Sequence, residues 1–182
     1  YHRDKFDRAD LLVNVLGADH HGYVARMHAA MAMLGHDPDK LEIAITQLVS
    51  LHRDGCEVRL SKRTGEMVEL AEVVEDVGAD AARFTYLLLS VDSPQTFDLD
   101  LVASQVNENP VFYVQYAHAR IHQVVRRATD VGINRGELSD ADFSLLCHSR
   151  ELEVLRALHE LPDVVSRACR ERAPHQVTTW VR

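Results

Sequence analysis

The 182-residue chain contains no long apolar segment, and its cysteines are few and scattered. No apolar run approaches the ~20 residues that a helix needs to span a bilayer, so we expect no membrane contact. The charged residues 1–5 also lack the apolar core of a secretory leader. Cys56, Cys147 and Cys169 form no Cys-x-x-Cys pair, which argues against a disulfide framework and a thiolate zinc site. We therefore expect a protein of the reducing cytoplasm.

Positive charge is in short supply as well. Lys and Arg number 20 against 28 for Asp and Glu, which gives a formal net charge of −8. A protein whose whole surface binds nucleic acid is usually basic, so any such contact here must be local. The candidate clusters are Lys62 with Arg63, and Arg120 with Arg126 and Arg127.

The chain also has no initiating methionine, no internal repeats and no low-complexity segment. Its last residue, Arg182, falls within a helical pattern that looks unfinished. We therefore expect an internal segment of a longer protein, so that parts of a functional site can lie outside these residues.

Residues 11–51 predict a strand–helix–strand unit. Residues 11–17 form a nearly continuous apolar run that ends at Gly17, as expected for a strand buried on both faces of a parallel sheet. A helical pattern continues to Gly35, which suits the C′ position, and residues 41–51 are a second strand candidate. Such a unit builds Rossmann-like sheets, which bind ligands at the C-terminal ends of their strands.

A hairpin and two helices are expected next. Asp54-Gly55 lies between two apolar-containing runs and is a strong turn signal. A helix over residues 70–77 should end at Gly78, and Asp80 should cap a second helix. The inward residues of this second helix are Ala81, Phe84, Leu88 and Val91.

From about residue 98 the pattern becomes purely helical, so we expect a domain boundary near this point. Asp98 should cap a short helix, and the Asn-Pro pair at residues 109–110 should begin the longest one. Ser139 and Asp142 resemble a capping box for a further helix, which Pro162 should interrupt. The apolar stripe of the longest helix consists of Val111, Val114, His118, Ile121 and Val125.

The stretch Gly-Ala-Asp-His-His-Gly at residues 17–22 is the first candidate site. It lies where a strand ends and a helix begins, and backbone N–H groups in such a place favour anions. Asp19 could accept hydrogen bonds from ribose hydroxyls, and His20 can donate or accept one. The alternative is that Asp19 merely caps the helix and the histidines are surface residues.

The segment Arg-Leu-Ser-Lys-Arg-Thr-Gly at residues 59–65 is the second candidate site. Its basic side chains, two hydroxyls and glycine can bind an anion. The alternative is a solvated surface loop, which short basic clusters often are. The segment is no Walker-type loop, because Gly65 is its lone glycine.

Tyr113, Tyr116 and Arg120 share one face of the longest helix at positions i, i+3 and i+7. Rings beside a basic group suit stacking on bases and contact with phosphates, whereas the alternative is a buried aromatic stripe. His118 and His122 have a spacing that suits a metal pair, but no third ligand accompanies them. No protein-bound metal is therefore predicted.

Three separated stretches together resemble arginyl-tRNA synthetase, a class I aminoacyl-tRNA synthetase. The first is residues 17–23, and the second is the loop at residues 59–63, which is similar to the family's Lys-Met-Ser-Lys-Ser motif. The third is residues 109–121, Asn-Pro-Val-Phe-Tyr-Val-Gln-Tyr-Ala-His-Ala-Arg-Ile, which are similar to the start of the family's helical anticodon-binding domain. The resemblance covers essentially the whole chain and weakens after about Val131.

The resemblance implies an α/β fold over residues 1–97, as the C-terminal half of a Rossmann-like catalytic domain. An incomplete, all-α helical-bundle anticodon-binding domain would follow over residues 98–182. The implied activity is ATP-dependent activation of arginine and its transfer to tRNA(Arg), with tRNA needed already for activation. The implied partners are tRNA(Arg), arginine and ATP with its Mg²⁺, and a cytoplasmic monomer is expected.

Residue roles also follow from the resemblance. Lys62 would reach the ATP phosphates and stabilise charge as pyrophosphate leaves, and Ser61 would help to hold the loop closed. Leu48 and Val49, at the end of the second strand, would flank adenine. The remaining ATP or adenylate contacts would come from Gly17, Asp19 and His20. The tRNA contacts would come from Tyr113, Tyr116 and Arg120.

The chain departs from the family pattern in two ways. In the loop, Arg59, Leu60 and Arg63 replace lysine, methionine and serine, which should cost little function. A His-Ile-Gly-His-type motif is absent and would lie upstream, as would the residues that select arginine, so the chain alone should not activate arginine. Two alternatives stay open: a non-catalytic tRNA-binding paralogue, and another class I synthetase such as cysteinyl-tRNA synthetase. The scattered cysteines speak against the zinc site that the latter would need.

Overall fold

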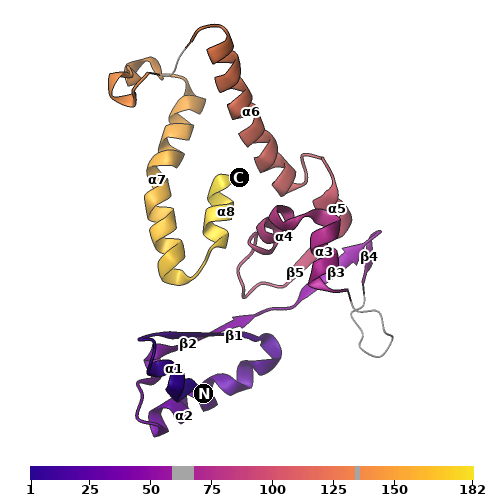
Figure 1. Ribbon diagram of the computed structural model, residues 1–182, viewed down its shortest axis with the longest axis vertical. Coiled ribbons are helices and arrows are strands. Elements are labelled where there is room, and N and C mark those ends of the chain that lie inside the picture. Colours follow the sequence, from indigo (N-terminus) through magenta and orange to yellow (C-terminus); the bar gives the residue numbers. More distant parts are fainter. Residues whose placement is uncertain (59–67, 134–135) are drawn as a thin grey trace.

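The computed structural model describes residues 1–58, 68–133 and 136–182. Figure 1 shows an elongated molecule in which three parts follow one another: a small N-terminal unit, a mixed unit of strands and helices, and a long helical part. Within the described residues, no helix combines the length and the apolar character that crossing a membrane requires.

The N-terminal unit contains the predicted strand–helix–strand arrangement. Its elements are α1 (His2–Phe6), β1 (Leu12–Gly17), η1 (Ala18–Tyr23), α2 (Val24–Met33), η2 (Pro38–Lys40) and β2 (Leu41–Thr46). The two strands pair in parallel, with Leu12 opposite Leu41 and Gly17 opposite Thr46. Gly35 follows the end of α2 with a φ of 80°, the left-handed conformation that was expected there.

The prediction that the first strand is buried on both faces is wrong. Leu12 packs against Met31 of α2 and Leu41 of β2, whereas Val13 and Val15 are 41% and 67% exposed. Successive residues of a strand point to opposite faces, and α2 covers the face that carries Leu12. The β1 valines on the other face are therefore exposed.

The mixed unit contains a second, three-stranded sheet. Its elements are β3 (Val49–Arg53), β4 (Cys56–Glu57), α3 (Leu70–Val77), α4 (Ala79–Tyr86), β5 (Gln95–Asp98) and α5 (Leu99–Ala103). The strand order is β4-β3-β5, with β4 antiparallel and β5 parallel to β3. Asp54 and Gly55 both have a positive φ, which is typical of a type I′ turn, and the predicted hairpin is confirmed. The strand β5 was not predicted.

The core of the mixed unit surrounds Phe97, which is fully buried, and Val73, which is 2% exposed. The other buried members of this cluster are Leu51, Ala81, Ala82, Leu99, Val102 and Val111. The cluster thus includes residues on both sides of the boundary predicted between residues 97 and 98. The start of the helical part is packed into the same core as the three-stranded sheet.

The cap predicted for the second helix of this unit is wrong. Gly78, with a φ of 83°, ends α3 and also precedes α4, so α4 begins at Ala79 and Asp80 lies in its first turn. A carboxylate in the first turn still interacts favourably with the helix dipole. Ala81 is buried as expected, but α4 ends at Tyr86, and Val91 beyond it is 44% exposed.

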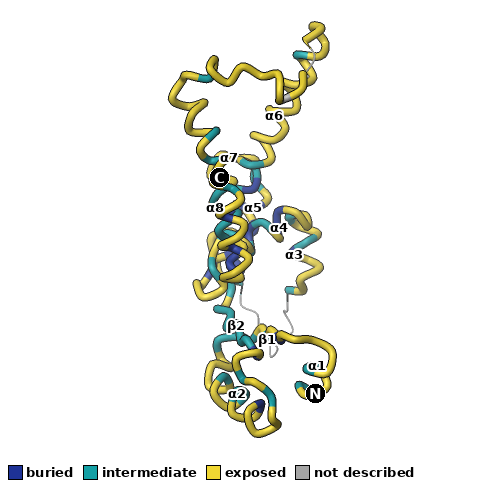
Figure 2. The backbone as a smooth tube through the Cα atoms, turned by 90° about the vertical axis from the view of Figure 1, so that its left-hand side faces the viewer, coloured by how far each residue is buried: buried dark blue, intermediate teal, exposed yellow. Residues whose placement is uncertain are grey.

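The helical part consists of α6 (Pro110–Asp130), η3 (Leu138–Asp140), η4 (Phe143–Leu145), α7 (Ser149–Glu171) and α8 (His175–Val181). Asn109 caps α6, as predicted. Val111 is buried, but Ile121 and Val125 of the apolar stripe are 64% and 50% exposed, because α6 extends away from the core after its first turn. Figure 2 shows most of α6 and α7 as exposed.

Two predictions for α7 are wrong. His148 and Glu151 form its capping box, whereas Asp142 caps the short η4 by accepting a hydrogen bond from the backbone N–H of Ser144. Pro162 lies inside α7 and does not interrupt it. A proline in a helix costs one backbone hydrogen bond, and the packing of α7 around buried Val164 and Ala168 offsets that cost.

Candidate functional site

The polar stretch after β1 forms a short turn of 3-10 helix before α2 begins at Val24. Asp19 makes no capping hydrogen bond, so the interpretation of Asp19 as a helix cap is not what the structure shows. Asp19 and His20 are exposed, and Oδ2 of Asp19 lies 3.5 Å from Nε2 of His20. The backbone at Gly17 passes close to this carboxylate, because a Cβ there would lie 2.7 Å from Oδ1 of Asp19. A side chain at position 17 would therefore require the exposed carboxylate of Asp19 to move.

Two further side chains join this cluster and were missed by sequence reasoning. The rings of His20 and Tyr23 meet edge to face, with centroids 5.7 Å apart. The guanidinium of Arg26 lies 5.6 Å from the centroid of the Tyr23 ring, within the range of a cation–π contact. The spacing of three residues on a helix was the available signal for the second pair. A carboxylate, an imidazole, a ring and a guanidinium thus gather at the C-terminal end of β1.

The prediction that Leu48 and Val49 lie at the end of the second strand is wrong. The strand β2 ends at Thr46, Leu48 is 79% exposed in the connection, and Val49 begins β3. The break arises because Gln47 donates its backbone N–H to the carbonyl oxygen of Val91 at 2.8 Å, outside the ladder with β1. Leu48 nevertheless follows the strand end that lies beside Gly17 in the parallel register.

The basic loop at residues 59–65, including Ser61 and Lys62, lies outside the described residues. The residues on either side of this segment contact the core of the mixed unit. Val58 donates its backbone N–H to the carbonyl oxygen of Leu51 at 2.7 Å, and Val58 and Val68 both pack against the core of the mixed unit. The chain thus enters and leaves this segment from one core.

The Tyr/Arg face of α6 is exposed. Tyr113 and Tyr116 are each 47% exposed, so neither ring is part of a buried stripe. Nη1 of Arg120 donates to the hydroxyl of Tyr116 at 3.1 Å, and the guanidinium lies 5.6 Å from the centroid of that ring. A groove of about 550 Å³ continues from this pair along α6. It is lined by Tyr116, Ala119, Arg120, Gln123, Arg126, Arg127 and Asp130.

The histidine pair of α6 is also exposed. Nε2 of His118 lies 3.1 Å from Nε2 of His122, and the rings meet edge to face. In the part of the chain that the structure describes, no group of three or more His, Cys, Asp or Glu side chains is placed to hold a metal ion. Cys56, Cys147 and Cys169 are free and exposed.

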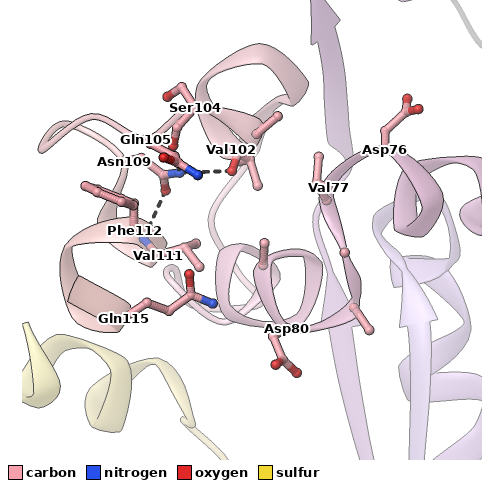
Figure 3. A pocket seen from close by; sticks show the side chains of 14 residues that line it. Asp76, Val77, Asp80, Val102, Ser104, Gln105, Asn109, Val111, Phe112 and Gln115 are labelled. Atoms are coloured by element: carbon pink, nitrogen blue, oxygen red, sulfur yellow. Dashed lines mark hydrogen bonds between the residues drawn. The ribbon is translucent and has the colours of Figure 1, made fainter. Parts of the chain in front are cut away.

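A pocket of about 430 Å³ lies where α3, α4, α5 and α6 meet, and sequence reasoning did not anticipate it (Figure 3). Asp76 and Asp80 line its α3–α4 side, where their carboxylates point away from the pocket, and Gln115 extends from α6 toward α4. Its wall includes Asn109, whose carboxamide is buried and fully hydrogen-bonded. The pocket thus marks the joint between the core and the exposed helix α6.

Comparisons with known proteins show what the chain is similar to. The family model of the DALR anticodon-binding domain matches residues 114–182. An arginine–tRNA ligase of Bacillus thuringiensis subsp. konkukian is 45% identical over 181 residues, which are 99% of this chain and 32% of that protein. One from Caldanaerobacter subterraneus subsp. tengcongensis is 46% identical over 183 residues, which are 100% of this chain and 33% of that protein.

Two solved structures have a similar fold. A structure assigned as an arginyl-tRNA synthetase from Campylobacter jejuni superposes with a TM-score of 0.85 at 34% identity, over 100% of this chain and 39% of that one. The Thermus thermophilus arginyl-tRNA synthetase gives a TM-score of 0.68 over 96% of this chain and 31% of that one. At 22% identity, the second similarity supports the fold alone.

The relatives and solved structures named above are aminoacyl-tRNA synthetases. Within this class, the chain resembles the arginyl-tRNA synthetases along its whole length, and the resemblance seen in its motifs is confirmed. The chain spans about a third of the length of the curated relatives that it matches.

Proposed function

We propose that this chain is a part of an arginine–tRNA ligase, which forms arginyl-adenylate from arginine and ATP and transfers arginine to the 3′ end of tRNA(Arg). The observation that supports this most is the identity of 45% and 46% with arginine–tRNA ligases over essentially the whole chain. Residues 1–97 would belong to the catalytic domain and residues 98–182 to an incomplete anticodon-binding domain. The chain alone would be inactive, and the whole protein would be a cytoplasmic monomer.

The C-terminal end of β1 would contribute to the ATP and adenylate site. Asp19 and His20 are exposed at this end, where ribose hydroxyls can donate to the carboxylate. Leu48 and Val49 would flank adenine from the connection that follows β2. Mg²⁺ would arrive with the ATP phosphates, and we assign no step to it, since the described residues offer no cluster of three ligands.

Lys62 and Ser61 would complete the catalytic machinery. A positioned ammonium beside the phosphates stabilises the charge that develops as pyrophosphate leaves. The packing of Val58 and Val68 on one core supports this role, because it anchors both flanks of the loop to the same part of the molecule. The hydroxyl of Ser61 would help to hold the loop over the phosphates.

The exposed face of α6 would bind tRNA. Tyr113 and Tyr116 offer rings for stacking, and Arg120, Arg126 and Arg127 offer charge for phosphates along one groove. A local basic face also reconciles tRNA binding with a net charge of −8.

A second candidate is a tRNA-binding paralogue that lacks a His-x-Gly-His motif and catalysis, because the exposed Tyr/Arg face of α6 would serve tRNA binding alone equally well. A cysteinyl-tRNA synthetase is not supported, since the relatives are named arginine–tRNA ligases. The upstream sequence separates the first two: a ligase needs that motif there.

The test is a charging assay of the whole protein with bulk tRNA and each of the twenty amino acids. We expect attachment of arginine alone, dependent on ATP. tRNA binding without charging of any amino acid would favour the paralogue, and charging of another amino acid would refute both proposals.

A further inference from the structure

Asn109 is buried between α5 and α6 and uses its whole carboxamide. It is 2% exposed, and its Oδ1 accepts a hydrogen bond from the backbone N–H of Val111 at 3.0 Å. Its Nδ2 donates to the carbonyl oxygens of Val102 at 2.9 Å and Ser104 at 2.7 Å. Figure 3 shows this side chain between the end of α5 and the start of α6.

Capping α6 explains only the bond to Oδ1. Serine and aspartate cap helices about as well as asparagine, because a single oxygen acceptor is enough. The two bonds from Nδ2 go instead to carbonyl groups at the C-terminal end of α5, where a helix leaves its last carbonyls unpaired. Asparagine is the capping residue that can also donate two hydrogen bonds, so it fastens one helix to the other.

The helix α5 is itself fixed to the three-stranded sheet. Leu99 and Val102 belong to the same buried cluster as Leu51 of β3. Oδ2 of Asp100 accepts a hydrogen bond from the backbone N–H of Asp54, in the β3–β4 turn, at 2.5 Å. Asn109 therefore connects the start of α6, through α5, to the three-stranded sheet, and so fixes the direction in which α6 leaves the core.

We propose that Asn109 is a positioning residue for the aminoacylation reaction: it sets the angle of α6, and with it the face of Tyr113, Tyr116 and Arg120, relative to the α/β part. This inference rests on the proposed function for its consequence in catalysis. A tRNA bound on a misdirected helix would still be held, but its 3′ end would miss the reacting atoms. A displacement of about 1 Å at the reaction centre can cost on the order of a hundredfold in rate.

The test uses the whole ligase with Asn109→Ser and Asn109→Asp, which keep a capping oxygen and remove the amide group that donates to Val102 and Ser104. We expect kcat for charging to fall about tenfold or more while the Kd for tRNA stays within about twofold. The control is Asp142→Ser, a cap substitution at η4, which should change neither value. An unchanged kcat, or a loss confined to tRNA affinity, would overturn the proposal.

A second measurement reports the geometry without any substrate. Spin labels are attached to Cys56 of β4 and, in a Val124→Cys variant, to α6, while the other cysteines are replaced by serine. Both labelled positions are exposed. We expect a narrow distance distribution in the parent and the control, and a broader or shifted one in both Asn109 variants. An unchanged distribution overturns the proposal, and so does unfolding of both variants, since Asn109 would then act on stability alone. A parent that charges no arginine refutes the proposed function, whereas the distances still decide the role of Asn109 in orienting α6.

Discussion

Arg172 and Glu42 form an ion pair that joins the end of α7 to the strand β2, 130 residues earlier in the chain. Nη2 of Arg172 donates to Oε1 of Glu42 at 2.9 Å, and Nε donates to the other carboxylate oxygen. Arg172 has a left-handed backbone, with a φ of 51°, where the chain turns from α7 toward α8. Both side chains are partly exposed beside a pocket of about 870 Å³. A surface contact thus links the helical part to the N-terminal unit.

This pair should make stability depend on pH. The hydrogen bond from Arg172 holds the pKa of Glu42 below its ordinary value of 4.5. The folded-state pKa is thus lower than the unfolded one, so the stabilisation is complete above pH 4.5 and is lost as the pH falls through the folded-state pKa. Thermal unfolding of Glu42→Gln should show a midpoint lower than that of the parent at pH 7, by no more than about 2 °C because the pair is exposed. The two midpoints should converge in acid.

The control for that comparison is Glu75→Gln, which removes an exposed carboxylate from α3. Its difference from the parent should not follow the same pH course. A Glu42→Gln effect that persists unchanged at pH 3 would show that the ion pair is not its cause.

Thr178 should hold α8 against α4. It is 8% exposed, and its hydroxyl lies 2.6 Å from the carbonyl oxygen of Leu87 and 2.9 Å from that of His175 in its own helix. Thr178→Val keeps the shape and leaves the carbonyl of Leu87 without its partner, so we expect a loss of about 1–2 kcal/mol in the free energy of unfolding. Urea denaturation at pH 7 measures it. Thr179→Val is the matched control, because the exposed hydroxyl of Thr179 bonds within its own helix; an equal loss in both variants would contradict the role of Thr178.

Local signals in the sequence predicted the elements that local chemistry determines. The Asp54-Gly55 turn, the Asn109 cap and the glycine at position 35 require particular backbone conformations or acceptors, and each lies where it was expected. The parallel pairing of β1 and β2 followed from a strand–helix–strand pattern, which has few alternative topologies.

Non-local packing determined the features that the sequence did not reveal. The strand β5 exists because Phe97 fits the core beside Leu51, and four residues are too few for a periodic signal. Pro162 stays within α7 because the packing of the helix outweighs the local cost of the proline, and local sequence does not reveal that packing. Apolar periodicity places Ile121 and Val125 on one stripe of α6, but it does not show whether anything covers that stripe, and both side chains are exposed.

The candidate site divides in the same way. Motifs led to Asp19, His20 and the Tyr/Arg face, whereas the contacts of Tyr23 with Arg26 and the second role of Asn109 depend on side-chain geometry. Leu48 was placed at a strand end because an apolar run does not mark where one strand stops and the next begins. The loop around Lys62 remains a prediction from sequence.

Lys62→Ala in the whole ligase should slow adenylate formation by one or more orders of magnitude. Removal of a positioned cation from the transferring phosphates costs roughly a few kcal/mol of transition-state stabilisation. Pyrophosphate exchange, with tRNA present, measures this step. Lys40→Ala removes an exposed lysine from η2 and should leave the rate unchanged. A normal rate in Lys62→Ala would remove Lys62 from the mechanism.

Tyr116→Ala should weaken tRNA binding and leave the fold intact. The ring is half exposed and carries Arg120 beside it, so its loss removes a stacking surface rather than a part of the core. Since base stacking contributes about 1–3 kcal/mol per base, the Kd for tRNA should rise about fivefold or more, while Tyr116→Phe should keep most of the affinity. Arg120→Ala should also reduce the salt dependence of binding, because it removes a phosphate contact. Fluorescence titrations measure the affinity. The control is Ile121→Ala, which changes an exposed apolar position on another side of α6. Unfolding of Tyr116→Ala would contradict the prediction, because it would show that the ring supports the fold.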